Sequence, residues 1–210
     1  MSDDVFAADG RVIGSRALAT RRKLLDATAK LLQEQVILDL RVVDISRDIG
    51  SSPATFYQYF NDVDEAILEL SKEATEDEKP LVALLQPGWT GSDGLERAGK
   101  FVDAYMVYWD THHAVLRARN LKAEEGNRHF RAVRTEANLL VMDALQAMVT
   151  EGIATKRLPE SLDPFTTAAA VVAMCERLLA FQPEMAKRGA NRDAIRNTLA
   201  TLVYGALTGH

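Results

Sequence analysis

The chain of 210 residues has a single cysteine, no long apolar run and no basic residue in its first ten positions. Because Cys175 has no possible partner within the chain, the sequence fits a reducing compartment, and we expect a cytoplasmic protein. The longest apolar runs, such as residues 168–175, are too short to cross a bilayer, so we expect no membrane association. The acidic first ten residues do not resemble a secretory signal peptide, which opens with basic and then apolar residues.

Enzyme motifs are also missing from the sequence. It has no glycine-rich phosphate loop and no serine placed on a strand–turn–helix elbow. His112 and His113, and the pair Glu125 and His129 on one helical face, invite a metal interpretation. Two such groups fall short of a metal site, and the spacing H-E-x-x-H is absent. We therefore expect no catalytic residue, no cofactor and no metal.

The charge is unevenly distributed along the chain. The formal net charge is −5, yet residues 11–60 hold eight basic and five acidic residues, which makes this segment +3. Residues 61–210 hold 17 basic and 22 acidic residues, and residues 1–10 add three acids. A locally basic segment on an acidic body is typical of a nucleic-acid reader attached to a larger domain.

Apolar residues recur at helical spacing from end to end, which predicts an all-α fold of about nine helices. Asp62 and Glu65 predict a capping box at the start of one helix, and Pro80 predicts its end near Lys79. Residues 36–40 are apolar and partly β-branched, as in a strand, but no partner strand is evident, so we expect the end of the first helix and a loop there. The helices are expected at residues 18–35, 42–49, 55–59, 63–79, 95–110, 114–121, 124–151, 165–181 and 194–207.

Residues 44–60, which read DISRDIGSSPATFYQYF, carry the most information. A helix ends at Gly50, a polar turn follows, and a very short helix then places polar side chains between Phe56 and Phe60, which we expect to be buried. Two short helices joined by a glycine-bearing turn form a helix-turn-helix, whose second helix can enter the DNA major groove.

The side chains in and around this motif suit DNA contacts. Gln58 can pair with adenine or contact the backbone, and Thr55 offers a hydroxyl and a methyl group. Tyr57 and Tyr59 suit phosphate contacts, although packing within the protein is the alternative for both rings. The basic run at residues 21–23 is either a phosphate grip or a solvated face. The predicted DNA-binding residues are Arg21, Arg22, Lys23, Arg47, Ser51, Ser52, Ala54, Thr55, Tyr57, Gln58 and Tyr59.

The order of a first helix, DISRDIG, a polar turn, PATFYQYF and an Asp-capped helix resembles TetR-family repressors over residues 18–72. The resemblance implies an N-terminal arm (1–17), a three-helix DNA-binding domain (18–62) and a helical effector-binding and dimerisation domain (63–210). It implies a repressor that a small molecule releases from its operator when the helix at residues 63–79 shifts. More weakly, residues 109–115 and 174–177 resemble actinobacterial members that repress an ethionamide-activating monooxygenase.

Apolar and aromatic residues of the body suit a pocket for a lipophilic, uncharged effector. Phe101, Tyr105 and Tyr108 share one helical face, and Trp109 lies beside Tyr105. An ordinary filled core is the alternative. Together with the weaker resemblance, this pattern predicts a set of effector-binding residues: Phe101, Tyr105, Tyr108, Trp109, Ala137, Leu140, Val172 and Cys175.

The last two helices are apolar nearly all round, so they need cover on both sides. We expect a two-fold homodimer through these helices, with burial inside the monomer as the alternative. Such a dimer would read a palindromic or near-palindromic double-stranded DNA operator, with its reader helices roughly 34–36 Å apart.

Some positions depart from the family pattern. Val63 stands where the family often has a phosphate-binding lysine, and Arg41 stands where a threonine cap is common. These departures predict either a weaker electrostatic part of DNA binding, with a shallower salt dependence, or phosphate contacts concentrated on the N-terminal basic segment. They also leave open a helical interaction or ligand-binding protein that has lost DNA binding.

Overall fold

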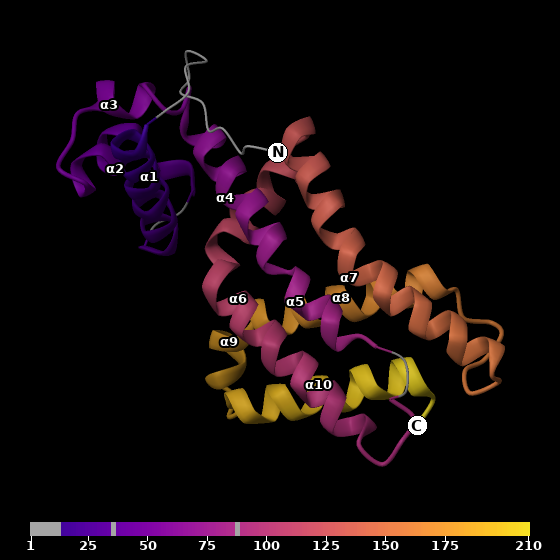
Figure 1. Cartoon of the computed structure of the whole chain (residues 1–210). Coiled ribbons are helices and arrows are strands. Elements are labelled where there is room, and N and C mark those ends of the chain that lie inside the picture. The colour runs from indigo at the N-terminus through magenta and orange to yellow at the C-terminus, as the bar shows by residue number, and fades with distance from the viewer. Residues whose placement is uncertain (1–13, 35–36, 87–88) are drawn as a thin grey trace. The chain divides into compact units, whose positions relative to one another are not determined.

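The computed structural model describes residues 14–34, 37–86 and 89–210, and within these ranges it contains helices and no strand (Figure 1). The predicted all-α fold is therefore confirmed. The N-terminal arm up to residue 13 and the strand-like Val36 lie outside the described residues. The elements are α1 (Ser15–Glu34), the 3-10 helix η1 (Ile37–Asp39), α2 (Val42–Asp48), α3 (Pro53–Tyr57), α4 (Val63–Asp77), α5 (Lys79–Leu84), α6 (Gly94–Glu124), α7 (Arg128–Ala154), α8 (Pro164–Ala180), α9 (Gln182–Ala186) and α10 (Arg192–Thr208).

One long helix, α6, replaces the two helices predicted at residues 95–110 and 114–121. That prediction was wrong because the intervening Thr111, His112 and His113 contain neither glycine nor proline. The Thr111 hydroxyl instead donates a hydrogen bond to the Val107 carbonyl at 2.9 Å, as threonine does inside a helix.

Two prolines begin short helices instead of ending long ones. The helix expected to reach Lys79 ends at Asp77, and Pro80 lies in the first turn of α5. Pro183 likewise lies in the first turn of α9, which the sequence did not predict. Proline suits this position because its fixed φ is helical and its missing N–H has no partner there anyway.

The chain divides into two compact units, and it crosses between them within α4, α6 and α7. Unit 1 comprises residues up to Ala74 together with Ala114–Arg134, and unit 2 comprises Thr75–His113 and Thr135–His210. The predicted boundary after residue 62 divides a DNA-binding from an effector-binding domain, and it does not coincide with the division into compact units. It stays a prediction.

The core of unit 1 joins the helix-turn-helix to residues far along the chain. Leu24, Ile45, Phe56 and Phe60 are completely buried there. The same cluster contains buried apolar side chains from the second half of α6 and the start of α7, namely Ala114, Val115, Ala118, Ala123 and Phe130. Unit 1 therefore needs both of its chain segments to close its core.

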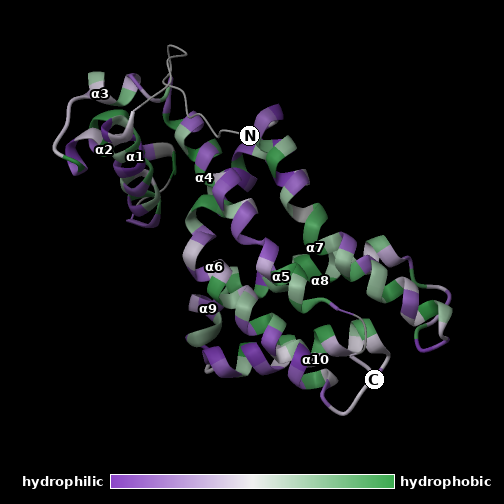
Figure 2. Cartoon of the chain, in the orientation of Figure 1, coloured by the Kyte–Doolittle hydropathy of each residue, from purple (hydrophilic) through white to green (hydrophobic). Residues whose placement is uncertain are grey.

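Unit 2 packs its helices through amphipathic faces, visible in Figure 2 as alternating green and purple residues along α7. Arg196 of α10 makes two hydrogen bonds to the Asp103 carboxylate of α6, at 2.8 and 2.7 Å. Asp163 and Asn191 cap α8 and α10 by accepting hydrogen bonds from backbone N–H groups three residues on. No helix in the described part of the chain has the length and apolarity needed to cross a bilayer.

Candidate functional sites

The turn of the helix-turn-helix is built around Gly50. Its φ of 67° lies in the left-handed region that favours glycine. This conformation lets the Ser51 backbone N–H donate to the Ser46 carbonyl at 2.8 Å, which closes the end of α2. The chain then enters α3 with Ser52 at the N-cap and Pro53 in the first turn. The predicted order of helix, turn and helix is confirmed, but α3 spans Pro53–Tyr57 rather than residues 55–59, so Gln58 and Tyr59 follow the helix. The helix begins earlier than expected because Pro53 suits its first turn.

Two aromatic residues anchor α3 to the core and leave its other face in solvent. The rings of Phe56 and Phe60 are completely buried, with centroids 5.4 Å apart. Tyr57 packs edge-on against Phe56 at 5.9 Å, yet 54% of its surface is exposed. Gln58 is also exposed, whereas Tyr59 is half-buried against the core of unit 1. The burial of Phe56 and Phe60 agrees with the prediction.

The remaining predicted contacts of the turn and α3 differ in exposure. Ser52 and Ala54 are exposed, and Ser51 and Thr55 are half-buried. The hydroxyls of Ser52 and Thr55 lie 3.3 Å apart and share a hydrogen bond. After α3, the Glu65 backbone N–H donates to Asp62 Oδ1 at 2.8 Å, so Asp62 caps α4 as predicted. The Glu65 carboxylate accepts from the backbone N–H of Asn61 rather than of Asp62, so the capping box is displaced by one residue.

The three basic residues at positions 21–23 differ in their surroundings. Arg21 pairs with Glu69 of α4 at 2.7 Å and lies 5.0 Å from the centroid of the Phe60 ring. Arg22 donates to both carboxylate oxygens of Glu73 at 2.8 Å. Lys23 is exposed to solvent. Carboxylates of α4, distant in sequence, therefore engage both arginines inside unit 1.

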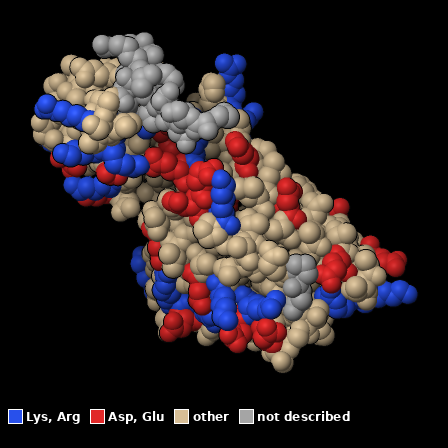
Figure 3. Space-filling view, viewed as in Figure 1, with Lys and Arg blue, Asp and Glu red and all other residues tan. Residues whose placement is uncertain are grey.

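Two other arginines of unit 1 extend into solvent from α2. Arg41, at the N-cap, and Arg47 each expose 73% of their side chains. Both pair with Asp44, at 3.1 and 3.2 Å. Figure 3 shows lysine and arginine side chains over α1–α3 at the upper left, interspersed with carboxylates. Arg41 was not among the predicted DNA-binding residues. Its position, a basic residue directly before the first helix of the helix-turn-helix, was a usable signal.

The interior of unit 2 holds a continuous row of aromatic rings along α6. Ring centroids lie 5.9 Å apart for Phe101 and Tyr105, 6.0 Å for Tyr105 and Tyr108, and 5.2 Å for Tyr108 and His112. Trp89 extends the row at 6.4 Å from Phe101. The sequence reasoning missed Trp89 because it lies in the Gly- and Pro-rich loop before α6.

The predicted effector-binding residues are buried in unit 2 with one exception. Seven of them are at most 7% exposed: Phe101, Tyr105, Tyr108, Trp109, Ala137, Val172 and Cys175. Leu140 of α7 is 36% exposed. The neighbouring Leu139 is also exposed, so this part of α7 presents apolar side chains to solvent rather than to the interior of unit 2.

Burial raises the pKa of two side chains in this interior, Cys175 and Tyr105, and so favours their uncharged forms. Burial, with a smaller effect from the charge of Glu176, raises the pKa of the Cys175 thiol to about 12. Burial also raises the pKa of Tyr105 well above its usual value, assisted by the charges of Glu176 and other neighbours. Among the described residues, Trp89 Nε1 is a buried donor without a hydrogen-bond acceptor. The interior is therefore apolar with a few polar tips, as small-molecule sites are.

The histidines considered as metal ligands have other contacts. His112 Nε2 lies 3.1 Å from the Asp77 carboxylate, and His113 Nδ1 lies 3.2 Å from the Asp110 carbonyl. In the described part of the chain, no three His, Cys, Asp or Glu side chains gather closely enough to hold a metal ion.

Comparison with known families decides the identity of the fold. The model of the tetracyclin repressor-like C-terminal domain matches residues 81–210. The chain belongs to the TetR family. TetR-family proteins are DNA-binding transcriptional regulators of the helix-turn-helix type and not enzymes, which agrees with the absence of catalytic motifs in the sequence.

Individual relatives agree with this assignment. An HTH-type transcriptional regulator of Haemophilus influenzae is 39% identical over 56 residues, so the match covers 26% of this chain and about a quarter (27%) of that relative. A transcriptional regulator from Saccharomonospora viridis in complex with choline has a TM-score of 0.70 at 20% identity, over 89% of this chain and 96% of that one. FadR from Bacillus subtilis in complex with stearoyl-CoA has a TM-score of 0.67 at 16% identity, over 88% and 98%. At these identities the two structures share the TetR fold with this chain.

Proposed function

We propose that the protein is a repressor that binds operator DNA through α3 and is released by a small lipophilic effector held in unit 2. The observation that carries this proposal is the orientation of α3. Phe56 of α3 and Phe60 just after it are buried and fix the helix to the core, while Tyr57 and Gln58 extend into solvent. A short, rigidly anchored helix with polar tips is what a major-groove reader requires.

Within this surface we assign separate roles to the side chains. Gln58 and Thr55 read base edges. Tyr57 and the serines of the turn contact phosphates and set the register, with Lys23 and Arg47 adding positive charge. We leave Arg21 and Arg22 outside the contact surface, because their guanidinium groups are engaged by Glu69 and Glu73. Ala54 approaches the groove without a polar contact, and the half-buried Tyr59 chiefly supports α3.

The effector site that we propose is the aromatic interior of unit 2. Two structural relatives were solved in complex with a small molecule, choline in one and stearoyl-CoA in the other, which supports a ligand-binding role for this fold. The buried side chains of Phe101, Tyr105 and Trp109 offer large apolar surfaces. Apolar burial of this kind favours a lipophilic effector.

Coupling between effector and DNA would pass along α6. This helix carries the aromatic row in unit 2 and continues without a break into Ala114, Ala118 and Ala123 of the unit 1 core. α4 crosses between the units in the same way. An effector that changes the register of these helices by its binding would alter the support of α3. A coupling free energy of about 1–3 kcal/mol would change operator occupancy by one to two orders of magnitude.

We further propose a two-fold homodimer through α8 and α10, reading a palindromic operator. Phe165, Phe181 and Leu202 lie on or next to these helices and are nearly half exposed. Large apolar side chains left in solvent along both helices support a surface that another subunit covers.

The decisive experiment measures the affinity of the Tyr57→Ala variant for a DNA duplex that the wild-type protein selects from a random library. We expect a decrease of about tenfold or more, since one well-placed contact is worth about 1–3 kcal/mol. Val107→Ala, at an exposed position of α6, is the control and should bind normally. A wild-type protein that selects no duplex would instead favour a ligand-binding or interaction protein that has lost DNA binding.

A further inference from the structure

The two exposed arginines of α2 form a defined arrangement rather than two separate surface charges. Asp44 accepts a hydrogen bond from Arg41 Nε through one carboxylate oxygen and from Arg47 Nη1 through the other. The three residues are spaced by three positions, so they lie along one face of α2. The Asp44 side chain is only 18% exposed, whereas each arginine side chain is 73% exposed.

This arrangement leaves most of each guanidinium available to a ligand. Each guanidinium has five N–H donors, of which Asp44 engages one in Arg41 and one in Arg47. The group of three side chains has a net charge of +1. Because Asp44 already orders both long side chains, a partner that binds them avoids part of the usual entropy cost.

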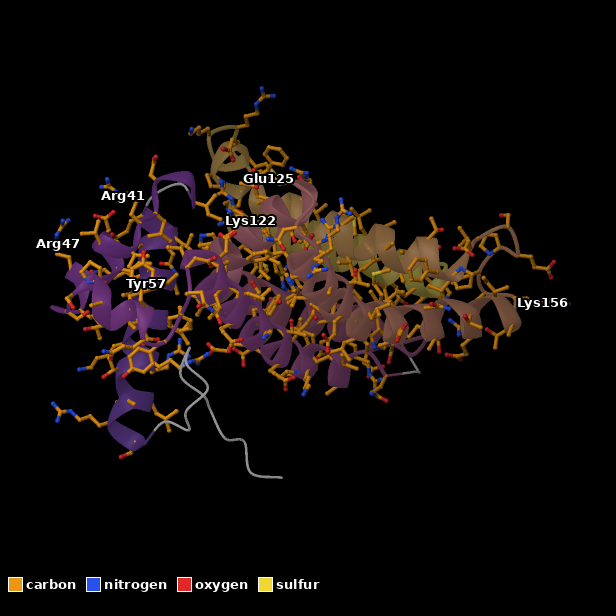
Figure 4. The ribbon with its side chains drawn as sticks, turned by 90° about the horizontal axis from the view of Figure 1, so that it is seen from above. Arg41, Arg47, Tyr57, Lys122, Glu125 and Lys156 are labelled. Carbon is orange, nitrogen blue, oxygen red and sulfur yellow. The ribbon has the colours of Figure 1, made fainter. Side chains whose placement is uncertain are left out.

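The arrangement also lies on the element that leads into the reader helix. α2 ends at Asp48, and the Gly50 turn connects it to α3. Figure 4 shows Arg41 and Arg47 at the same end of the ribbon as Tyr57, and all three belong to unit 1. Planar guanidinium groups match phosphate oxygens better than a lysine ammonium does.

We propose that Arg41 and Arg47, held apart by Asp44, bind two phosphates of the DNA backbone beside the groove that α3 enters. This inference rests on the proposed function and adds to it a phosphate-binding pair and a positioning residue. Arg41 and Arg47 contact the phosphates. Asp44 contacts no DNA and fixes the separation and direction of the two guanidinium groups.

The test compares salt dependence among single variants. Affinity is measured by fluorescence anisotropy over a salt series, on the selected duplex and on a mixed-sequence duplex of equal length. Arg41→Gln and Arg47→Gln should each reduce the slope of log affinity against log salt by about 0.9 for each phosphate that the variant no longer neutralises, and by twice that in a symmetric dimer. The reduction should be equal on both duplexes, because phosphate binding carries no sequence information.

Arg97→Gln is the control, since Arg97 is an arginine of unit 2 that also pairs with a carboxylate three or four positions away, Asp93 at 2.8 Å. It removes the same charge and should leave the slope unchanged. Asp44→Asn should keep or raise affinity for the mixed duplex, because a negative charge is removed. It should also lower the preference for the selected duplex by about threefold to tenfold, because the arginines lose their ordered positions.

The outcomes separate this inference from the proposed function. If the wild-type protein binds the selected duplex but both arginine variants keep the slope of Arg97→Gln, the phosphate pair is wrong and the repressor proposal stands. Equal behaviour of Asp44→Asn and wild type on both duplexes would remove the positioning role of Asp44. If the wild-type protein binds neither duplex, the proposed function fails, and this inference fails with it. Circular dichroism confirms that each variant is folded.

Discussion

Glu69 is the carboxylate of α4 that holds two cations, Arg21 and Lys72, both at 2.7 Å. Burial opposes its ionisation, but the hydrogen bonds from Lys72 and Arg21 outweigh burial and lower the pKa of Glu69. A lowered pKa means that the folded state is stabilised above the unfolded-state value, about 4.3. That stabilisation disappears as the pH falls through the folded-state pKa.

Glu69→Gln should therefore lower the free energy of unfolding at pH 7 by on the order of 1 kcal/mol. The difference from wild type should shrink as the pH falls below about 4. Urea unfolding at several pH values measures both effects. A difference that stays constant down to about pH 3 would show that the carboxylate charge has no part in stability.

Cys175 reports on the interior of unit 2. With its pKa raised to about 12 by burial, the thiol holds roughly one part in ten thousand of reactive thiolate at about pH 8. Maleimide should label the native protein at least about a hundredfold more slowly than the unfolded chain, as followed by mass spectrometry. Labelling at the rate of the unfolded chain would mean that this interior opens to solvent.

The residue-level predictions from sequence succeeded where local pattern decides the environment. The burial of Phe56 and Phe60 and the turn after Gly50 follow from spacing and turn chemistry within one motif. The ion pairs of Arg21 and Arg22 could not be predicted in this way, because their partners Glu69 and Glu73 lie 48 and 51 residues away in the chain. Only folding brings α4 beside α1, so sequence alone left these arginines between a DNA contact and a solvated face and could not predict their ion pairs.

At the level of elements, sequence predicted the long helices and mistook their ends. Pro80 was taken as a signal that ends a helix, yet it lies in the first turn of α5, as Pro183 lies in the first turn of α9. α6 was predicted as two helices, at residues 95–110 and 114–121, but it is continuous. A helix that is covered by different neighbours along its length changes its buried face, so its periodicity cannot be followed from the sequence.

Gly94, the first residue of α6, is the glycine that the fold can least replace. A Cβ added there would lie 1.7 Å from the Trp89 carbonyl oxygen and 2.6 Å from the Tyr204 ring. Gly94→Ala should lower the free energy of unfolding by about 1–3 kcal/mol, although alanine favours helix by itself. Gly91→Ala is the control, because its Cβ would meet only the flexible Asp93 carboxylate. Equal midpoints for both variants in thermal unfolding would contradict this packing.

At the scale of the whole molecule, the proposed homodimer predicts that an exposed apolar residue of α10 is covered in solution. Leu202→Glu should weaken dimerisation by about tenfold or more, because it would bury a charge in an apolar contact. Leu95→Glu is a matched control, since Leu95 of α6 is exposed to the same extent, 49% against 48%. Sedimentation equilibrium measures both. An unchanged dimer in Leu202→Glu would place the subunit contact elsewhere.

The division of the chain into two units constrains how such proteins can exchange parts. The core that supports α3 contains Ala114–Phe130, which follow the aromatic stretch of α6 in the sequence. If two related genes were recombined at one point between residues 75 and 113, the DNA reader would come from one relative. The residues of α6 and α7 that complete its core would come from the other. New pairings of operator and effector need three junctions, after residues 74, 113 and 134, so that the second segment of unit 1 moves with the reader. Engineers of chimaeric regulators face the same requirement.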